Sequence, residues 1–471
     1  MKARANKTGW TFAIVSTALF MVVLDNLVVT NALPSIKHDL GATIQQLEWT
    51  VNAYTLSYAV LLLTGAALGD RFGRRRIFTF GLSLFTFASA AAALAPSTSA
   101  LIAARAIQGV GAAVVTPLTL TLLSEAVPTE KRGLAIGAWS GISGLAVALG
   151  PVVGGAVVTG ISWHWIFWLN VPIGLIAAPL AMRRLDESYG ENSSLDFPGV
   201  GLASAGLLGV VYGIVHASSA GWTDITVLAP VAIGTAFLAA FVTWELRTPQ
   251  PMLPMSFFRS RAFSTTNGVS IAMYFGTFGS VFLLAQFFQI AQGYSALQSG
   301  LRILPWTVMP IFISPLAGIL SDRIGGRPLM ALGLALQGAG LAWMATMTSA
   351  TVPYIDLVPG FVMAGAGMAL VFAPAANTVL GAVRPTQAGQ ASGATNAIRE
   401  LGGVLGVSVL ATVFSAHGGY ASPQDYVDGL IPAVWVGAAV LFAGALVALM
   451  IPTKKREAAQ RAAEIAAPSA A

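Results

Sequence analysis

Long apolar segments separated by short polar loops fill almost the whole chain. Fourteen of them have the length of a membrane-spanning helix, which needs about 20 mostly apolar residues. Their apolar runs are continuous, whereas the strands of a membrane barrel alternate. The pattern predicts spans over 11–33, 48–69, 77–95, 101–123, 135–159, 165–183, 197–216, 225–245, 264–290, 300–320, 328–348, 354–377, 390–414 and 431–451. We therefore expect an all-α integral membrane protein.

Composition supports this expectation. Of 471 residues, 56% are hydrophobic and only 9% are charged, whereas soluble domains carry about 25% charged residues. The chain contains no cysteine, which excludes disulfides, thiolate metal sites and cysteine nucleophiles. The first apolar segment is too long for the core of a signal peptide, so it is expected to be a retained helix.

The net charge of +6 is distributed in a way that predicts orientation. Lys and Arg cluster in every second gap between apolar segments, as the positive-inside rule requires of cytoplasmic loops. With an even number of spans, both termini are expected in the cytoplasm. Because the charge follows the loops, we expect a multi-pass protein of the plasma (inner) membrane in contact with lipid, and no nucleic-acid partner.

A repeated loop motif predicts two lobes. Asp70, Arg71 and Arg74 follow the second span, and Asp322 and Arg323 follow the tenth. Internal repeats of this kind are typical of transporters whose site lies between the repeats. The expected units are a six-helix lobe over 1–190, an inserted helix pair over 191–246, a cytoplasmic connector over 247–262, a second six-helix lobe over 263–452 and a cytoplasmic tail over 453–471.

The repeated loop groups are interpreted as a conformational latch. A carboxylate and basic groups at helix ends can pair with the opposite lobe in one state and release it in another. The alternative is that the basic cluster only sets the topology.

Ionisable residues inside the predicted spans are the candidate chemistry. Asp25 lies in the middle of the first span, where an ionised group costs roughly 2.5–3.5 kcal/mol and usually marks an ion or substrate pathway. Arg105 cannot lose its proton, so it needs an acceptor or water. Glu400 is a second deep acid, and Arg399 beside it points about 100° away on a helix. For each group, a purely structural pairing is the alternative.

Several motifs together resemble one family. The loop 65–76 reads GAALGDRFGRRR, and 24–34 reads LDNLVVTNALP. Further segments are RAIQGVGAA over 105–113, Gly144 followed by GPVVGG over 150–155, and WHWIFWLNVP over 163–172. With fourteen spans, this combination resembles the fourteen-helix drug:proton antiporters of the major facilitator superfamily, along essentially the whole chain. One departure is Ala66, where the family usually has glycine.

The resemblance implies roles for individual residues. It implies proton coupling at Asp25, tuned by Arg105, with Glu400 a candidate second site, and the residues leave open which acid carries the proton. It associates Gly144, Gly150, Pro151 and Gly154 of the fifth span with export. Proline frees a backbone carbonyl, and glycines allow close helix contact.

The substrate cavity is expected to have aromatic and apolar walls with a buried acid, which suit lipophilic and often cationic compounds. Glu48 and Arg302, at corresponding outer helix ends, are either an outer gate or solvated ends. The candidate cavity residues are Asn26, Asn31, Asn52, Tyr58, Gln108, Trp139, Tyr274, Gln286, Trp306, Asn396 and Arg399.

The expected function is proton-coupled export of such compounds by alternating access. The alternatives are a dedicated exporter of one metabolite or antibiotic, an uptake symporter, or a non-transporting membrane sensor. The chain has no GxxxxGK[ST] phosphate-binding loop, no metal-ligand spacing and no nucleophile–base signature. We therefore expect a protein that is not an enzyme and has no cofactor beyond the coupling proton. The expected fold fits a monomer.

Overall fold

The computed structural model describes residues 2–128, 132–190, 196–249, 251, 253–383 and 388–453. Apart from one short 3-10 helix, all regular structure in these ranges is α-helical, which agrees with the predicted fold class. The predicted tail over 453–471 lies outside the described residues except for Thr453.

The helices follow the predicted segments closely. They are α1 (Lys2–Leu40), α2 (Ile44–Phe72), α3 (Arg74–Ala93), α4 (Thr98–Ala126), α5 (Arg132–Gly160), α6 (Trp165–Trp168), α7 (Asn170–Arg184), α8 (Phe197–Ala220), α9 (Ile225–Glu245), η2 (Met255–Arg259), α10 (Arg261–Ile290), α11 (Ala296–Ile324), α12 (Gly326–Met347), α13 (Tyr354–Gly381), α14 (Ala388–His417) and α15 (Pro423–Ala448).

Twelve helices are long and apolar enough to cross a membrane in the described part of the chain, or thirteen if α2, bent by 51°, is one span. In α5, the apolar helix found among the described residues is the shorter stretch Leu149–Gly160. This helix overlaps the predicted span over 135–159. The predicted span over 165–183 is built from α6 and α7.

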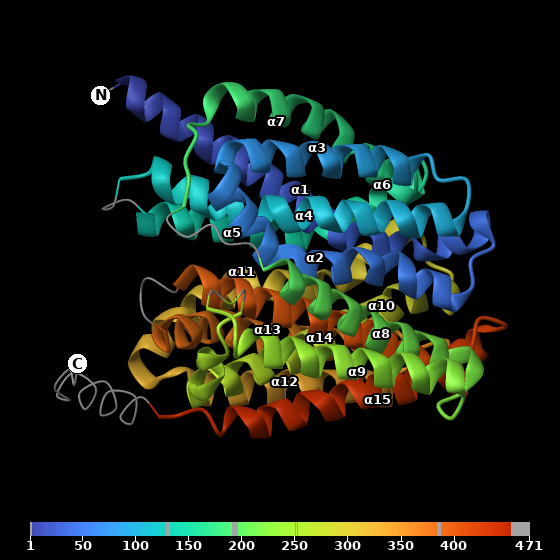
Figure 1. The fold of residues 1–471 in the computed structure, drawn as a ribbon. Coiled ribbons are helices and arrows are strands. Elements are labelled where there is room, and N and C mark those ends of the chain that lie inside the picture. Colours follow the sequence, from blue (N-terminus) through green and yellow to red (C-terminus); the bar gives the residue numbers. More distant parts are fainter. Residues whose placement is uncertain are drawn as a thin grey trace.

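The helices form two bundles with the inserted pair beside them (Figure 1). α1–α7 pack into one lobe and α10–α15 into the other, and the lobes meet through α2 with α14, α5 with α11 and α1 with α10. α8 packs on α9 and also contacts α2 and α14. The inserted pair therefore lies against both lobes, along the seam formed by α2 and α14.

Local structure repeats between the lobes where the sequence repeats. Gly73 and Gly325 end α2 and α11 with φ of 106° and 87°, a region that favours glycine because it lacks a Cβ. The same two helices begin with a capping box, formed by Thr43 with Gln46 and by Ser295 with Gln298. The capping boxes are thus a second feature that repeats between the lobes. They correspond to short S/T-x-x-Q patterns in the sequence, which are separate from the repeated loop motif.

The two ends of the molecule differ in charge. α1 begins and α15 ends at the left of Figure 1, where the basic loops after α2 and α11 also lie. We call this the basic end, and the end carrying the loops after α1 and α3 the opposite end.

Candidate functional site

A cavity of about 1640 Å³ lies between the lobes. It reaches the basic end, where Asp70, Arg74 and Asp196 line it together with prolines of the connector. Toward the opposite end the lobes are in contact. Gln289 Nε2 of α10 donates to the Asn31 carbonyl of α1 at 3.1 Å, and the Leu297 amide donates to the Thr159 hydroxyl at 3.0 Å. The conformation is therefore open at the basic end and closed at the other.

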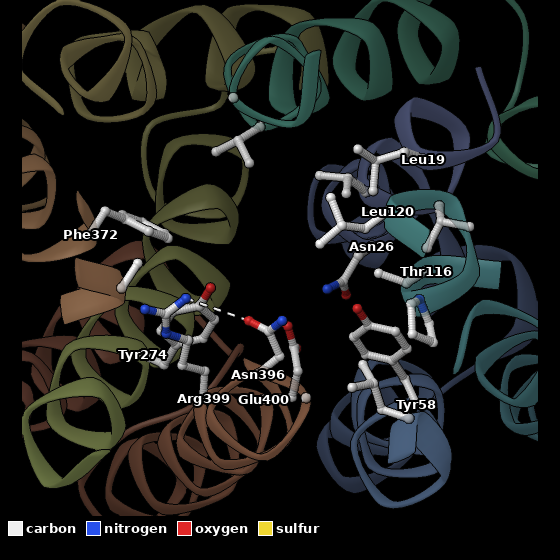
Figure 2. Close-up of a pocket in the computed structure, with 18 of the residues that line it drawn as sticks. Leu19, Asn26, Tyr58, Thr116, Leu120, Tyr274, Phe372, Asn396, Arg399 and Glu400 are labelled. Carbon is white, nitrogen blue, oxygen red and sulfur yellow. Dashed lines mark hydrogen bonds between the residues drawn. The ribbon is translucent and has the colours of Figure 1, made fainter. Parts of the chain in front are cut away.

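Both lobes contribute walls to the cavity (Figure 2). Asn26, Tyr58 and Thr116 of the first lobe face Tyr274, Phe372 and Arg399 of the second, and Asn396 and Glu400 lie between them. The rings of Tyr274 and Phe278 stack with centroids 5.3 Å apart. The walls are thus mainly apolar and aromatic with few polar groups, as in most small-molecule sites.

Asp25 forms a buried network inside the first lobe. Its carboxylate accepts from Arg105 at 2.5 Å, from Asn170 at 2.7 Å and from Gln108 at 2.9 Å. Ser89 accepts a further bond from Gln108 at 2.8 Å. These residues come from α1, α3, α4 and α7. The hydrogen-bond network around the Asp25–Arg105 pair therefore connects four helices.

Arg105 has two further contacts that fix its orientation. Its Nε donates to the Thr50 carbonyl at 3.2 Å, and its guanidinium lies 4.2 Å from the Tyr54 ring centroid. The side chains of Arg105 and Asp25 both have 0% exposure, and neither residue lines the cavity. The first-lobe pair is therefore separated from the substrate space by a layer of side chains that includes Tyr54.

Arg399 and Glu400 of α14 both line the cavity. Arg399 makes one long hydrogen bond, at 3.5 Å to Asn396, and its Nε and Nη2 have no hydrogen-bond partner among the described residues. Glu400 Oε2 also lacks one there. Because both residues line the cavity, their charges can act on a molecule bound there, whereas Asp25 and Arg105 do not line it.

Seven of the eleven predicted cavity residues line the cavity. The prediction was wrong in placing the other four there, because their amides are used between or within helices. Asn31 bonds Pro151, Asn52 donates to Ser408 of the other lobe at 2.8 Å, and Gln108 belongs to the Asp25 network. Gln286 accepts from Tyr420 at 2.7 Å. The seven are Asn26, Tyr58, Trp139, Tyr274, Trp306, Asn396 and Arg399.

The loop motif after α2 pairs within its own lobe. Asp70 accepts from Arg74 at 2.7 Å, and Arg74 also pairs with Glu125 of α4. Arg71 is exposed, with its guanidinium 5.4 Å from the Phe72 ring centroid. These groups make no described contact with the second lobe in this conformation. Arg323 is exposed, and the side chain of Asp322 lies outside the described residues.

The glycines of α5 have two different surroundings. A Cβ on Gly150 would lie 2.6 Å from Leu27, and one on Gly154 would lie 2.7 Å from the Val28 carbonyl, so both allow α5 to approach α1. A Cβ on Gly144 would meet nothing within 4 Å, because this residue lines the cavity. The expectation of close helix contact is therefore wrong for Gly144. Pro151 also lines the cavity.

The departure at Ala66 also has a structural explanation. Ala66 lines the cavity, where a methyl group finds space. The neighbouring Gly65 makes the close contact, since a Cβ there would lie 2.4 Å from the Ala113 carbonyl of α4. The helix contact is therefore close despite the substitution.

The sequence did not indicate several members of these networks. Ser89 and Asn170 complete the Asp25 site, and Glu125 and Glu187 pair with the basic loop. Asn170 lies in the quoted segment 163–172. For Ser89, the only sequence signal was that it is a polar residue within an apolar run.

Glu48 is not a solvated helix end, because its exposure is 0%.

Comparison with known proteins gives consistent results. The sequence profile of the Major Facilitator Superfamily matches residues 15–407 and 270–470. The methylenomycin A resistance protein of Streptomyces coelicolor is 32% identical over 97% of this chain and 95% of its own length. The cephamycin export protein of Amycolatopsis lactamdurans is 36% identical over 89% and 90%. The tetracenomycin C resistance and export protein of Streptomyces glaucescens is 33% identical over 90% and 79%.

Solved structures with the same fold have distant sequences. A bacterial homologue of the human lysosomal transporter Spinster, crystallised in an inward-facing conformation, aligns with a TM-score of 0.67 at 16% identity, over 96% of this chain and 98% of that one. An auto-inhibited POT family peptide transporter aligns with a TM-score of 0.68 at 15% identity, over 94% and 96%. This similarity concerns the fold.

Proposed function

The chain belongs to the major facilitator superfamily, and we propose that within it the protein exports small lipophilic compounds, many of them cationic, in exchange for protons. The relatives reported above are resistance and export proteins, which supports efflux. The proposal involves no enzymatic step and no cofactor other than the coupling proton.

The observation that carries the proposal is the cavity itself. It lies between the lobes, is open at one end only, and presents aromatic walls with the partly unpaired Glu400. A lipophilic cation gains apolar burial and cation–π contact on such walls and a counter-charge from the carboxylate. The same walls accept a neutral lipophilic molecule, which would not need Glu400.

We assign the coupling proton to Asp25. Protonation would remove the negative charge that holds Arg105, Gln108 and Asn170 in one arrangement. Since these residues join α1, α4 and α7, proton binding would favour a different packing of the first lobe. A ligand shifts a conformational equilibrium only by its differential affinity for the two states, and here the proton is that ligand.

The driving force is sufficient for accumulation. One proton crossing a 100 mV potential releases about 2.3 kcal/mol, which sustains an approximately fifty-fold gradient of a neutral substrate before any pH difference is added.

We infer from the basic clusters that both termini and the open end of the cavity face the cytoplasm, and that the membrane is the plasma membrane. The described conformation then faces inward and receives substrate from the cytoplasm or the inner leaflet. Asp70 and Arg74 pair within their own lobe here, and we propose that the basic loops, Arg71 and the Asp322–Arg323 segment included, contact the other lobe when the basic end closes.

A narrower specificity is the second candidate. Two of the relatives reported above are named for the export of a single antibiotic, and Arg399 in the cavity wall would bind an anionic or polar substrate. A panel of compounds of different charge distinguishes the two specificities.

The test is substrate-dependent proton movement in proteoliposomes under an imposed pH gradient. Lipophilic cations and neutral drugs are added to wild type, Asp25→Asn and Glu400→Gln. We expect proton movement in wild type, its loss in Asp25→Asn with substrate binding retained, and a selective loss of cation transport in Glu400→Gln. Proton movement that survives Asp25→Asn and disappears for every substrate in Glu400→Gln would overturn the assignment of the coupling proton.

A further inference from the structure

Glu48 is a buried carboxyl group for which the proposed mechanism has no role. It lies in the second turn of α2, at the closed end, with 0% exposure. Neither Oε1 nor Oε2 has a hydrogen-bond partner in the described part of the chain. Asp25, equally buried, accepts bonds from three residues. These two buried acids of the first lobe are therefore in opposite electrostatic situations.

Glu48 lies at the junction of the lobes. One helical turn further along α2, on the same face, Asn52 donates to Ser408 of α14. Tyr420, which follows α14 in the second lobe, lies near enough to Glu48 for the two groups to interact electrostatically. The Lys37 ammonium lies 3.5 Å from the centroid of the Tyr420 ring. Closure of this end therefore brings the second lobe against Glu48.

No described cation neutralises Glu48. The guanidinium of Arg105 bonds Asp25 and the Thr50 carbonyl, and Lys37 lies over the Tyr420 ring. α3 contributes no titratable side chain at this end. The titratable groups of the elements packed around this part of α2 are Lys37, His38 and Asp39 of α1, Arg105 of α4, Tyr212 and His216 of α8, His417 of α14 and Tyr420 after it. His38 and Asp39 pair with each other at 3.0 Å.

A carboxylate buried without a partner is far more costly than the neutral acid. We therefore propose that Glu48 is a second proton-binding site, which must hold a proton for the lobes to close at this end. When this end opens, water reaches the carboxyl group and the proton is released. Glu48 does not line the cavity, so its proton returns to the side from which it came.

The proposal rests on the alternation between two conformations that the proposed function includes, but not on coupling at Asp25. Proton linkage determines the direction in which pH shifts the equilibrium between the closed and open forms. The closed form binds one proton more than the open form, so raising the pH favours the open form. One linked proton changes the ratio of the two forms by up to about tenfold per pH unit.

Spin-label distances at the closed end test this directly. The chain has no cysteine, so Ser99→Cys on α4 and Ser349→Cys after α12 introduce two exposed labelling sites, one in each lobe. Pulsed electron resonance on protein in nanodiscs, from pH 5 to pH 8.5, reports the fractions with a short and a long distance. We expect the long-distance fraction of the wild-type background to rise with pH.

Two substitutions at the same position provide the decisive comparison. Glu48→Gln keeps the size and removes the charge, so we expect it to favour the short distance and to lose about one proton from the pH dependence. Glu48→Asp keeps a titrating carboxyl group and should retain the dependence. An unchanged pH response in Glu48→Gln, or its equal loss in Glu48→Asp, would overturn the proposal.

The same measurement with Asp25→Asn separates this proposal from the proposed function. We compare the Asp25→Asn protein with the double variant Asp25→Asn/Glu48→Gln. The two should still differ in pH response, even though both have lost export. If proteoliposomes show no proton-driven export but the Glu48 effect is present, the proposed function fails and the second proton site stands. If the effect disappears with Asp25→Asn, the second site is not independent and the proposal fails.

Discussion

The two lobes each hold an acid and an arginine within the membrane, and they use them differently. In the first lobe, Asp25 and Arg105 are fully buried and bonded to each other, and they do not line the cavity. In the second, Arg399 and Glu400 line the cavity and leave several polar atoms without partners among the described residues. The first pair stabilises an arrangement of helices, whereas the second can interact with what enters. We therefore propose that similar charges serve conformation in one lobe and recognition in the other.

The largest expected effect is on stability. Arg105→Ala leaves the Asp25 carboxylate buried without its charged partner and should lower the free energy of unfolding by about 3–5 kcal/mol. Arg399→Ala removes no salt bridge among the described residues and should cost about 1 kcal/mol or less. Thermal unfolding of the detergent-solubilised protein measures both. Equal losses would mean that the two arginines do not differ in the way described here.

The next effect concerns recognition. Glu400→Gln removes the negative charge of the cavity wall, so we expect affinity for a lipophilic cation such as tetraphenylphosphonium to fall about 10- to 100-fold, equivalent to about 1.5–3 kcal/mol. A neutral compound of similar size should bind within about threefold of wild type, because its burial is unchanged. Fluorescence or calorimetric titration decides, and an equal loss for both compounds would contradict the assigned role.

A smaller effect tests the difference in hydrogen bonding. Ser89→Ala removes the acceptor of the second Gln108 N–H inside the first-lobe network and should cost about 1 kcal/mol of stability. Asn396→Ala, which removes the single long bond to Arg399, should cost less than about 0.5 kcal/mol. The unfolding assay used for the arginines serves here. A reversed order would show that the cavity-facing network is the more structural one.

The smallest effect has the opposite sign. The positive charge of Arg399 acts on the neighbouring Glu400 and competes with a bound cation for it. Arg399→Gln should therefore strengthen cation binding by about three- to fivefold, in keeping with the modest energies of partly solvated charge pairs. The gain should shrink at high ionic strength, because salt screens the interaction. Weaker cation binding in this variant would indicate that Arg399 positions Glu400 rather than competing for it.

Much of the fold followed from the sequence because the bilayer restricts the possible structures. Backbone polar groups in hydrocarbon must be bonded internally, so a continuous apolar run becomes a helix almost independently of its neighbours. The repeated loop motif around Asp70 and Asp322 indicated two lobes, and the agreement extends to a positive-φ glycine at the same place in both. Such features depend on local chemistry, which the sequence states directly.

The candidate site was predictable only in part. The sequence marked Asp25, Arg105 and Glu400 as unusual, because any ionisable residue in an apolar segment is costly. It did not show that Ser89 and Asn170 complete the network around Asp25, or that Asn31, Asn52 and Gln286 turn away from the cavity. These outcomes depend on the rotation of each helix about its axis, which residues far apart in the chain determine.

By itself, the sequence determined that this is a two-lobed membrane protein with costly charges at a few positions, since hydropathy and motif spacing are properties of single segments. Only the tertiary structure decided which of those charges are bonded, which face the cavity and which, like Glu48, are buried without a partner among the described residues. The physical reason is that the energy of a buried charge is set by the groups around it, and packing brings those groups together from separate helices.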